Sequence, residues 1–180
     1  MKRIVVFFAA LMLGAVLPAQ DLDKPMDWME TSPKAIVEAG PQAIPVVDFE
    51  GLLALLQQED NRIRVINFWA TWCAPCIEEL PYFEEMAGKY GSSGVEVFLV
   101  SLDFPAAWEG RLPKFIRKKG LKSPVIILDD PDQNSWIPRV DPGWSGAIPA
   151  TLIYRGDTRA FYETTFDRAS LEAAIESFIR

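Results

Sequence analysis

Two hydrophobic patterns alternate along the chain after residue 43, and this alternation predicts strands that follow helices in turn. Continuous apolar and β-branched runs, typical of buried strands, occupy residues 44–47, 62–69, 95–102 and 124–128. Apolar residues at three- and four-residue spacing, typical of helices packed on a sheet, occupy residues 52–56, 73–90 and 108–119. This order predicts an α/β protein built around one central sheet.

The C-terminal part ends with a different pattern. Residues 150–155 and 158–164 are predicted to be two strands joined at Gly156, and Asp167 is placed to cap a last amphipathic helix. Residues 129–146 contain several prolines and two tryptophans, which predicts an irregular loop with some local structure.

The N-terminus has the pattern of an export signal. Lys2 and Arg3 precede an uncharged apolar run of 14 residues at 4–17. A membrane-spanning helix needs about 20 such residues, so cleavage is favoured, with an uncleaved membrane anchor as the alternative. We therefore expect an exported protein in the periplasm or another extracytoplasmic space.

The length of 180 residues fits one domain with an extension. We assign residues 1–19 to a signal peptide. Residues 20–42, with three prolines and little periodicity, are assigned to an N-terminal extension or linker. Residues 43–180 are assigned to a single folded domain.

Composition excludes several classes of function. The 18 basic side chains face 25 acidic ones, which gives a net charge of -7 and disfavours a nucleic-acid partner. The chain has no histidine, so imidazole cannot serve as a general base or as a metal ligand. With only two cysteines, we expect no metal site and no cofactor besides a disulfide.

The two cysteines lie in the run Trp72–Cys73–Ala74–Pro75–Cys76, between a predicted buried strand and a predicted helix. Unpaired N–H groups at a helix N-terminus stabilise a thiolate, which makes Cys73 the expected nucleophile. Cys76 follows one turn later and can resolve a mixed disulfide, while Pro75 suits the first helical turn. Trp72 is expected to offer an apolar contact surface to partners.

An isolated pair of this spacing can also be a structural disulfide or half of a metal site. A metal site needs further soft ligands that the chain lacks. A disulfide that closes so short a loop stabilises a fold little. The context therefore favours redox chemistry.

The segment NFWATWCAPC, followed by Glu79-Leu80-Pro81, resembles the thioredoxin superfamily, and in particular its TlpA-like or ResA-like branch of exported thiol-disulfide oxidoreductases. The resemblance covers residues 43–180. It implies a thioredoxin fold, in which a central mixed β-sheet is flanked by helices. It also implies that residues 101–130 contain the helix and strand that this branch inserts into the basic fold.

The same resemblance implies roles for residues outside the cysteine motif. A cis-proline faces the cysteines in this family, and Pro149 matches its place, which would put the Ile148 backbone beside Cys73 as a pairing edge for substrate. Asn67 stands where thioredoxins carry a buried Asp. Glu79 matches an acidic residue near the disulfide in ResA-like proteins and is the candidate proton acceptor for Cys76.

These features predict a reductase of protein disulfides that uses a Cys73–Cys76 dithiol. Glu78 and Glu79 oppose the thiolate, and the motif holds no cation, so a strong oxidant is disfavoured. The resemblance implies protein thiols as partners, apocytochrome haem-attachment thiols as one candidate class in cytochrome c maturation, and a membrane electron donor of the DsbD type.

Two alternatives remain open at this point. The cysteine pair could carry a soft ion such as Cu(I), against which the lack of nearby His or Met ligands counts. A peroxiredoxin-like peroxidase shares the broad fold, but its Thr-x-x-Cys arrangement is missing because Thr71 lies only two residues before Cys73.

Overall fold

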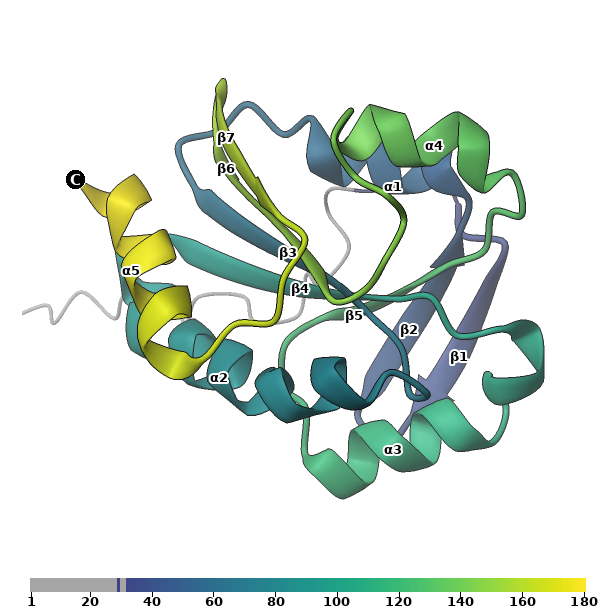
Figure 1. The fold of residues 1–180 in the computed structure, drawn as a ribbon. Coiled ribbons are helices and arrows are strands. Elements are labelled where there is room, and N and C mark those ends of the chain that lie inside the picture. Colours follow the sequence, from purple (N-terminus) through teal and green to yellow (C-terminus); the bar gives the residue numbers. More distant parts are fainter. Residues whose placement is uncertain (1–28, 30–31) are drawn as a thin grey trace, which may run out of the picture.

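A computed structural model describes residue 29 and residues 32–180 (Figure 1). Its centre is a seven-stranded mixed sheet with strand order β1-β2-β5-β4-β3-β6-β7. The β2-β5, β5-β4 and β4-β3 pairs are parallel, and the others are antiparallel. The strands are β1 (Ala35–Ala39), β2 (Gln42–Val47), β3 (Ile63–Trp69), β4 (Val95–Ser101), β5 (Val125–Leu128), β6 (Ala150–Arg155) and β7 (Thr158–Tyr162).

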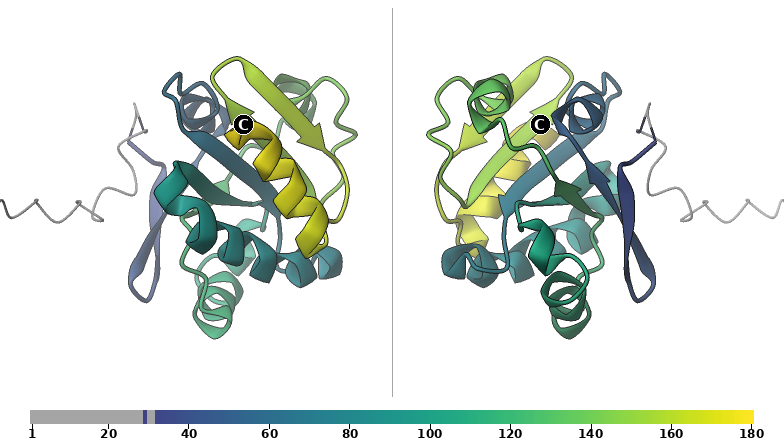
Figure 2. Two further views of the ribbon diagram at one scale, coloured as in Figure 1. Left: turned by 90° about the vertical axis from the view of Figure 1, so that its left-hand side faces the viewer. Right: turned by 90° about the vertical axis from the view of Figure 1, so that its right-hand side faces the viewer.

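Helices cover both faces of the sheet, with α1 and α4 on one side and α2, α3 and α5 on the other (Figure 2). The helices are α1 (Phe49–Leu56), α2 (Ala74–Tyr90), α3 (Arg111–Lys119), α4 (Gln133–Val140) and α5 (Arg168–Ile179), with short 3-10 turns η1 (Gly91–Ser93) and η2 (Pro105–Ala107). The predicted central mixed sheet flanked by helices is confirmed.

Strand β3 lies inside the sheet, between β4 and β6, and contributes to both hydrophobic cores. Its alternating side chains place Val65 and Trp69 in the core under α2, α3 and α5, and Ile66 and Phe68 in the core under α1 and α4. Every residue of β3 is buried. The chain therefore leaves β3 at a fixed position directly before the cysteine motif.

The inserted segment is present as predicted. Between β4 and residue 130 the chain forms η2, α3 and β5. Strand β5 pairs in parallel with both β2 and β4. The insertion thus places one additional strand inside the sheet, between β2 and β4. Helix α3 begins three residues later than predicted, after Gly110.

The prediction for residues 20–42 is corrected at its C-terminal end. Residues 35–39 form β1, which pairs antiparallel with β2 and makes the sheet one strand wider. Gly40 adopts φ 74° in the tight connection between them, a conformation that glycine favours. The charged and proline-bearing composition hid this hairpin because an edge strand tolerates exposed polar residues.

The signal peptide assigned to residues 1–19, and residues 20–28, 30 and 31 of the assigned extension, lie outside the described residues. Within the part of the chain that the structure describes, no helix is both long and apolar enough to span a bilayer.

Helix α5 begins with a capping box that also fixes the residue before it. The Asp167 side chain accepts a hydrogen bond from the Ser170 N–H at 2.8 Å, and the Ser170 hydroxyl oxygen accepts in return from the Asp167 N–H at 3.1 Å. Phe166, immediately before the cap, is buried. The capping box thereby fixes the start of α5 in a position from which the Phe166 N–H reaches a side chain of α2.

We expect Asp167→Ala to lower the free energy of unfolding by about 1 kcal/mol, because the first turn of α5 loses its acceptor. Asp167→Asn keeps a side-chain oxygen and should lose much less. Urea denaturation of the three proteins measures both values. Equal losses in the two variants would contradict a capping role.

Candidate functional site

Cys73 and Cys76 form a disulfide at the N-terminus of α2, with their Cα atoms 5.3 Å apart. Cys73 is the N-cap residue, and its Sγ accepts a hydrogen bond from the Cys76 N–H at 3.3 Å. The Cys73 residue is 6% exposed and Cys76 is 0% exposed. Cys73 is thus the more accessible of the two, as expected of a nucleophile, although most of its surface is buried.

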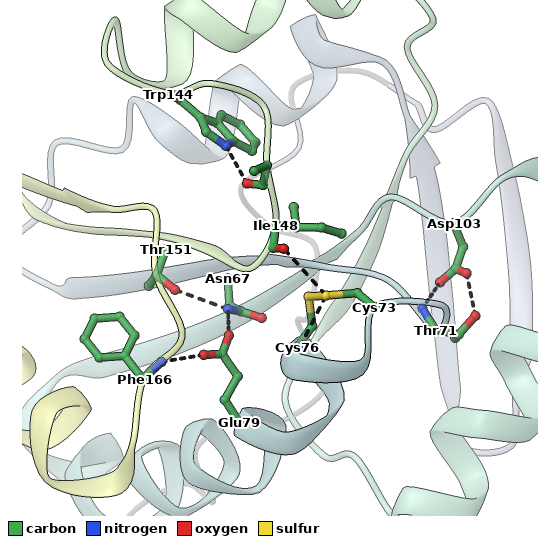
Figure 3. Close-up of a disulfide and its surroundings, with 11 residues drawn as sticks. Asn67, Thr71, Cys73, Cys76, Glu79, Asp103, Trp144, Ile148, Thr151 and Phe166 are labelled. Atoms are coloured by element: carbon green, nitrogen blue, oxygen red, sulfur yellow. Dashed lines mark hydrogen bonds between the residues drawn. A yellow bond between two sulfur atoms is a disulfide. The ribbon is translucent and has the colours of Figure 1, made fainter.

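The loop before β6 faces the disulfide. The Ile148–Pro149 peptide bond is cis, as the family resemblance predicts. The Ile148 carbonyl oxygen lies 3.7 Å from Cys73 Sγ (Figure 3). Pro149 is buried and Ile148 is half-buried, so the structure brings both predicted residues to the cysteines.

A ring of aromatic side chains holds this loop from the opposite face of the sheet. Trp144 is buried, and its ring lies 4.7 Å from that of Phe68 on β3. Its indole N–H donates to the Ala147 carbonyl at 2.8 Å. Residues 129–146 are therefore better ordered than predicted, with α4 inside them and Trp136 packed against Trp144 at 5.6 Å.

Glu79 is buried beneath the disulfide and not on the helix surface (Figure 3). Its Oε1 accepts from Asn67 Nδ2 at 2.9 Å, and its Oε2 accepts from the Phe166 N–H at 2.8 Å. Asn67 also donates to Thr151 Oγ1, at 3.2 Å, across the β3-β6 pair. The carboxyl group therefore joins α2, β3 and the start of α5.

Burial raises the pKa of Glu79 to about 7, because ionisation of a carboxyl group that is removed from water costs solvation energy. The hydrogen bonds from Phe166 and Asn67 act in the opposite direction and do not cancel that cost. A carboxyl group with such a pKa can exchange a proton near neutral pH. Glu79 lies one turn beyond Cys76 on the same helix.

The residues before Cys73 are fixed by a second buried carboxylate, which sequence reasoning missed. Asp103 follows β4 and accepts from the Thr71 N–H at 2.9 Å and from the Thr71 hydroxyl at 2.5 Å. The Ser101 hydroxyl donates to it at 3.0 Å. Arg111 donates to the Thr71 carbonyl at 2.8 Å, so α3 brings a cation to the loop that leads into the motif.

An exposed apolar surface borders the disulfide. The Trp72 and Phe104 rings stack at 6.3 Å and are 50% and 67% exposed. Ala74 and Pro75 are exposed on the first turn of α2. Trp72, Ala74 and Pro75, the predicted substrate-binding residues of the motif, are thus all exposed next to the disulfide. Phe104, which the sequence analysis did not select, extends this surface.

The geometry also bears on the alternatives. Thr71 is occupied by Asp103 and does not face the cysteines as a Thr-x-x-Cys arrangement would require. Across residue 29 and residues 32–180, no three His, Cys, Asp or Glu side chains gather closely enough to hold a metal ion.

Comparison with known proteins identifies relatives over most of this domain. The sequence model of the AhpC/TSA family matches residues 48–155. The thiol-disulfide oxidoreductase ResA of Geobacillus kaustophilus is 32% identical over 152 residues, which cover 83% of this chain and 82% of that protein. ResA of Halalkalibacterium halodurans is 33% identical over 96 residues, 52% of this chain. This second match spans only about half (53%) of that relative's length.

Solved structures show the same fold. A putative thiol:disulfide interchange protein DsbE from Chlorobium tepidum has a TM-score of 0.56 at 21% identity, covering 86% of this chain and 99% of that one. A secreted Mycobacterium tuberculosis disulfide oxidoreductase homologous to DsbE has a TM-score of 0.51 at 22% identity, covering 66% and 84%. The predicted thioredoxin fold and the ResA-like resemblance are confirmed.

We expect Glu79→Gln to remove a pH-dependent loss of stability. The folded wild-type protein keeps the Glu79 proton up to a pKa of about 7, whereas the unfolded chain releases it near the ordinary glutamate pKa of 4.5. The folded state thus binds more protons in that window, and its stability falls as pH rises. Above this window Glu79→Gln should gain up to about 3 kcal/mol relative to wild type.

Urea denaturation at about pH 5 and about pH 8 measures this gain. Glu78→Gln is the matched control, because Glu78 is the neighbouring acid on the exposed side of α2 and should leave the wild-type pH dependence in place. A stability difference between Glu79→Gln and wild type that does not change with pH would contradict the assignment.

Proposed function

The chain belongs to the AhpC/TSA family and to its ResA-like thioredoxin relatives, and from this we propose that it is a thiol-disulfide oxidoreductase that reduces protein disulfides. The observation that carries the proposal is the Cys73–Cys76 disulfide at the N-terminus of α2, with Cys73 Sγ 3.7 Å from the Ile148 carbonyl. This arrangement supports the proposal, because it brings the proposed nucleophile beside the backbone edge proposed to pair with substrate.

The reaction proceeds by two exchanges at sulfur. The Cys73 thiolate attacks a substrate disulfide, forms a mixed disulfide and releases one substrate thiolate. Cys76, once deprotonated, attacks Cys73 Sγ, closes the Cys73–Cys76 disulfide and releases the second thiolate. A reduced dithiol partner must then restore both cysteines, and a membrane donor of the DsbD type is the candidate.

The N-terminus of α2 supports the first exchange, because its N–H groups and dipole favour the Cys73 thiolate. Cys76 is fully buried, so its proton needs an acceptor inside the protein before the second exchange. Glu79 is the group proposed to take the Cys76 proton in the second exchange. Its raised pKa, about 7, makes the carboxylate a competent base near neutral pH.

A reductive direction is supported by charge around the motif. Glu78 and the buried Glu79 follow Cys76 on α2, and both oppose a thiolate. The positive charge of Arg111, at the Thr71 carbonyl on the other side of the motif, acts in the opposite direction to these two acids. A reduction potential at the oxidising end of the range for such proteins would contradict a reductase.

Partners are proposed to be proteins with accessible cysteine pairs, and apocytochrome thiols are the candidate class for a role in cytochrome c maturation. The Trp72 and Phe104 surface suits an extended segment with apolar side chains beside its cysteine. The export pattern of residues 1–19 and the secreted M. tuberculosis relative support a location outside the cytoplasm. Detection of the protein in a periplasmic or culture-medium fraction tests this location.

We expect Cys73→Ala to abolish insulin reduction by the dithiol-reduced protein, because no nucleophile remains to form the mixed disulfide. Turbidity of the released insulin chains measures the rate. Cys76→Ala should instead accumulate mixed disulfides, and their isolation from cells would identify the physiological partners.

Wild-type protein that fails to reduce insulin or any trapped partner would overturn the proposed function. Stoichiometric, tight Cu(I) binding would favour the carrier alternative. Turnover of peroxide that depends on Cys73 would favour the peroxidase.

We expect Phe104→Ala to lower kcat/KM for insulin about tenfold, because one of the two exposed rings beside the disulfide is lost. The rate with hydroxyethyl disulfide, which is too small to reach this surface, should not change. Ile179→Ala removes an exposed apolar side chain at the distant end of α5 and is the matched control (Figure 1). Equal losses on both substrates would contradict a docking role.

A further inference from the structure

Asn67 carries a buried polar atom that the site described so far does not use. The side chain is fully buried, and its Nδ2 donates to Glu79 Oε1 and Thr151 Oγ1. Among the described residues, its Oδ1 has no hydrogen-bond donor. An amide oxygen that is removed from water without a partner costs free energy, so its position needs a reason.

The orientation of the amide is set by its neighbours. In the structure the Nδ2 side of Asn67 faces Glu79, with Nδ2 2.9 Å from Oε1. The ionised carboxylate requires this orientation, because it can only accept hydrogen bonds. Thr151 Oγ1 accepts the second hydrogen. Oδ1 is consequently turned away from both groups.

The free oxygen is directed at the redox centre. Asn67 lies on the side of β3 that faces α2, because its alternate neighbours Val65 and Trp69 pack in that core. Cys76 precedes Glu79 by three residues on the same face of α2. Figure 3 shows the Asn67 amide oxygen on the side turned toward the disulfide.

The donor that this oxygen lacks is created by the reaction itself. Neither sulfur carries a proton while Cys73 and Cys76 are bonded. When a dithiol partner reduces the pair, the S–S bond breaks, the partner acquires a disulfide, and its two protons pass to the Cys73 and Cys76 sulfurs. The buried Cys76 thiol then faces Asn67.

We propose that Asn67 Oδ1 accepts a hydrogen bond from the Cys76 thiol in the reduced protein only, and thereby stabilises the dithiol form over the disulfide. The inference deepens the proposed function, since it requires that the pair is opened by reduction. The two polar atoms of the Asn67 side chain then have different roles. Nδ2 donates to Glu79 in both redox forms, whereas Oδ1 accepts a hydrogen bond only when the cysteines are reduced.

The S–H stretching band in the infrared spectrum tests the bond directly. The chain has only two cysteines, so Cys73→Ser leaves Cys76 as its sole thiol. Its S–H band should lie at the lowered frequency of a hydrogen-bonded thiol. Adding Asn67→Leu should move the band to the frequency of a free thiol.

Thr151→Val is the matched control for this measurement. It removes the other acceptor of Nδ2 and leaves Oδ1 in place, so the band should stay where it is. A band that does not respond to Asn67→Leu would overturn the proposal. If Asn67 had only a structural role, its substitution would not change the frequency of the Cys76 S–H stretch.

Equilibration with glutathione provides a second readout. Asn67→Leu should shift the dithiol–disulfide equilibrium about tenfold toward the disulfide, which corresponds to about 30 mV for a two-electron couple. The shift should persist in a Glu79→Gln background, because the substituted amide retains an acceptor for Nδ2 without a charge. A shift that vanishes in that background would assign the effect to Glu79 and overturn the proposal.

If Asn67→Leu does not fold, the wild-type protein still decides the matter. The side-chain amide NMR resonances of Asn67 should move on reduction, and unchanged resonances would overturn the proposal. None of these measurements uses a protein substrate. Loss of insulin reduction with the Cys76 signals intact would therefore refute the proposed function and leave this inference standing.

Discussion

The geometry of the site depends on burying one ionisable group, Glu79, between a helix and the middle of the sheet. A carboxyl group in that place must find donors, and it finds them in Asn67 on β3 and in the backbone N–H of Phe166 before α5. These two bonds fix the rotation of α2 about its axis. The rotation in turn fixes where Cys73 and Cys76 emerge at the start of the helix.

Much of the fold follows from the sequence because most of its elements are strongly periodic. Buried runs such as residues 95–102 need no tertiary information to be identified as strands, and the α2 and α5 patterns are unambiguous. The cysteine motif can also be identified from the sequence, because its position between a buried strand and a helix places Cys73 at a helix N-terminus, where a thiolate is stabilised. The cis bond before Pro149 and the role of Glu79 came from family resemblance.

The remainder depends on contacts between residues distant in sequence, which local patterns do not encode. Asp103 is 32 residues from Thr71, and nothing near it distinguishes it from a surface acid. Glu79 stands in a run of helix acids of which its neighbour Glu78 is exposed. Only the pairing of β3 with β6, which places Asn67 beside Thr151, shows that this part of the core is polar. The strand β1 was missed because edge strands lack a buried pattern.

Trp144 links the two sides of the protein in a way that concerns evolution as much as mechanism. Its ring belongs to the core beneath α1 and α4, yet its indole N–H holds the loop that carries Ile148 to the sulfur atoms on the other side. Changes in a core remote from the cysteines can therefore reach the substrate-facing backbone without touching it. Sequence changes among relatives in the core beneath α1 and α4 are therefore one way in which the same cysteine pair could come to act on different substrate proteins.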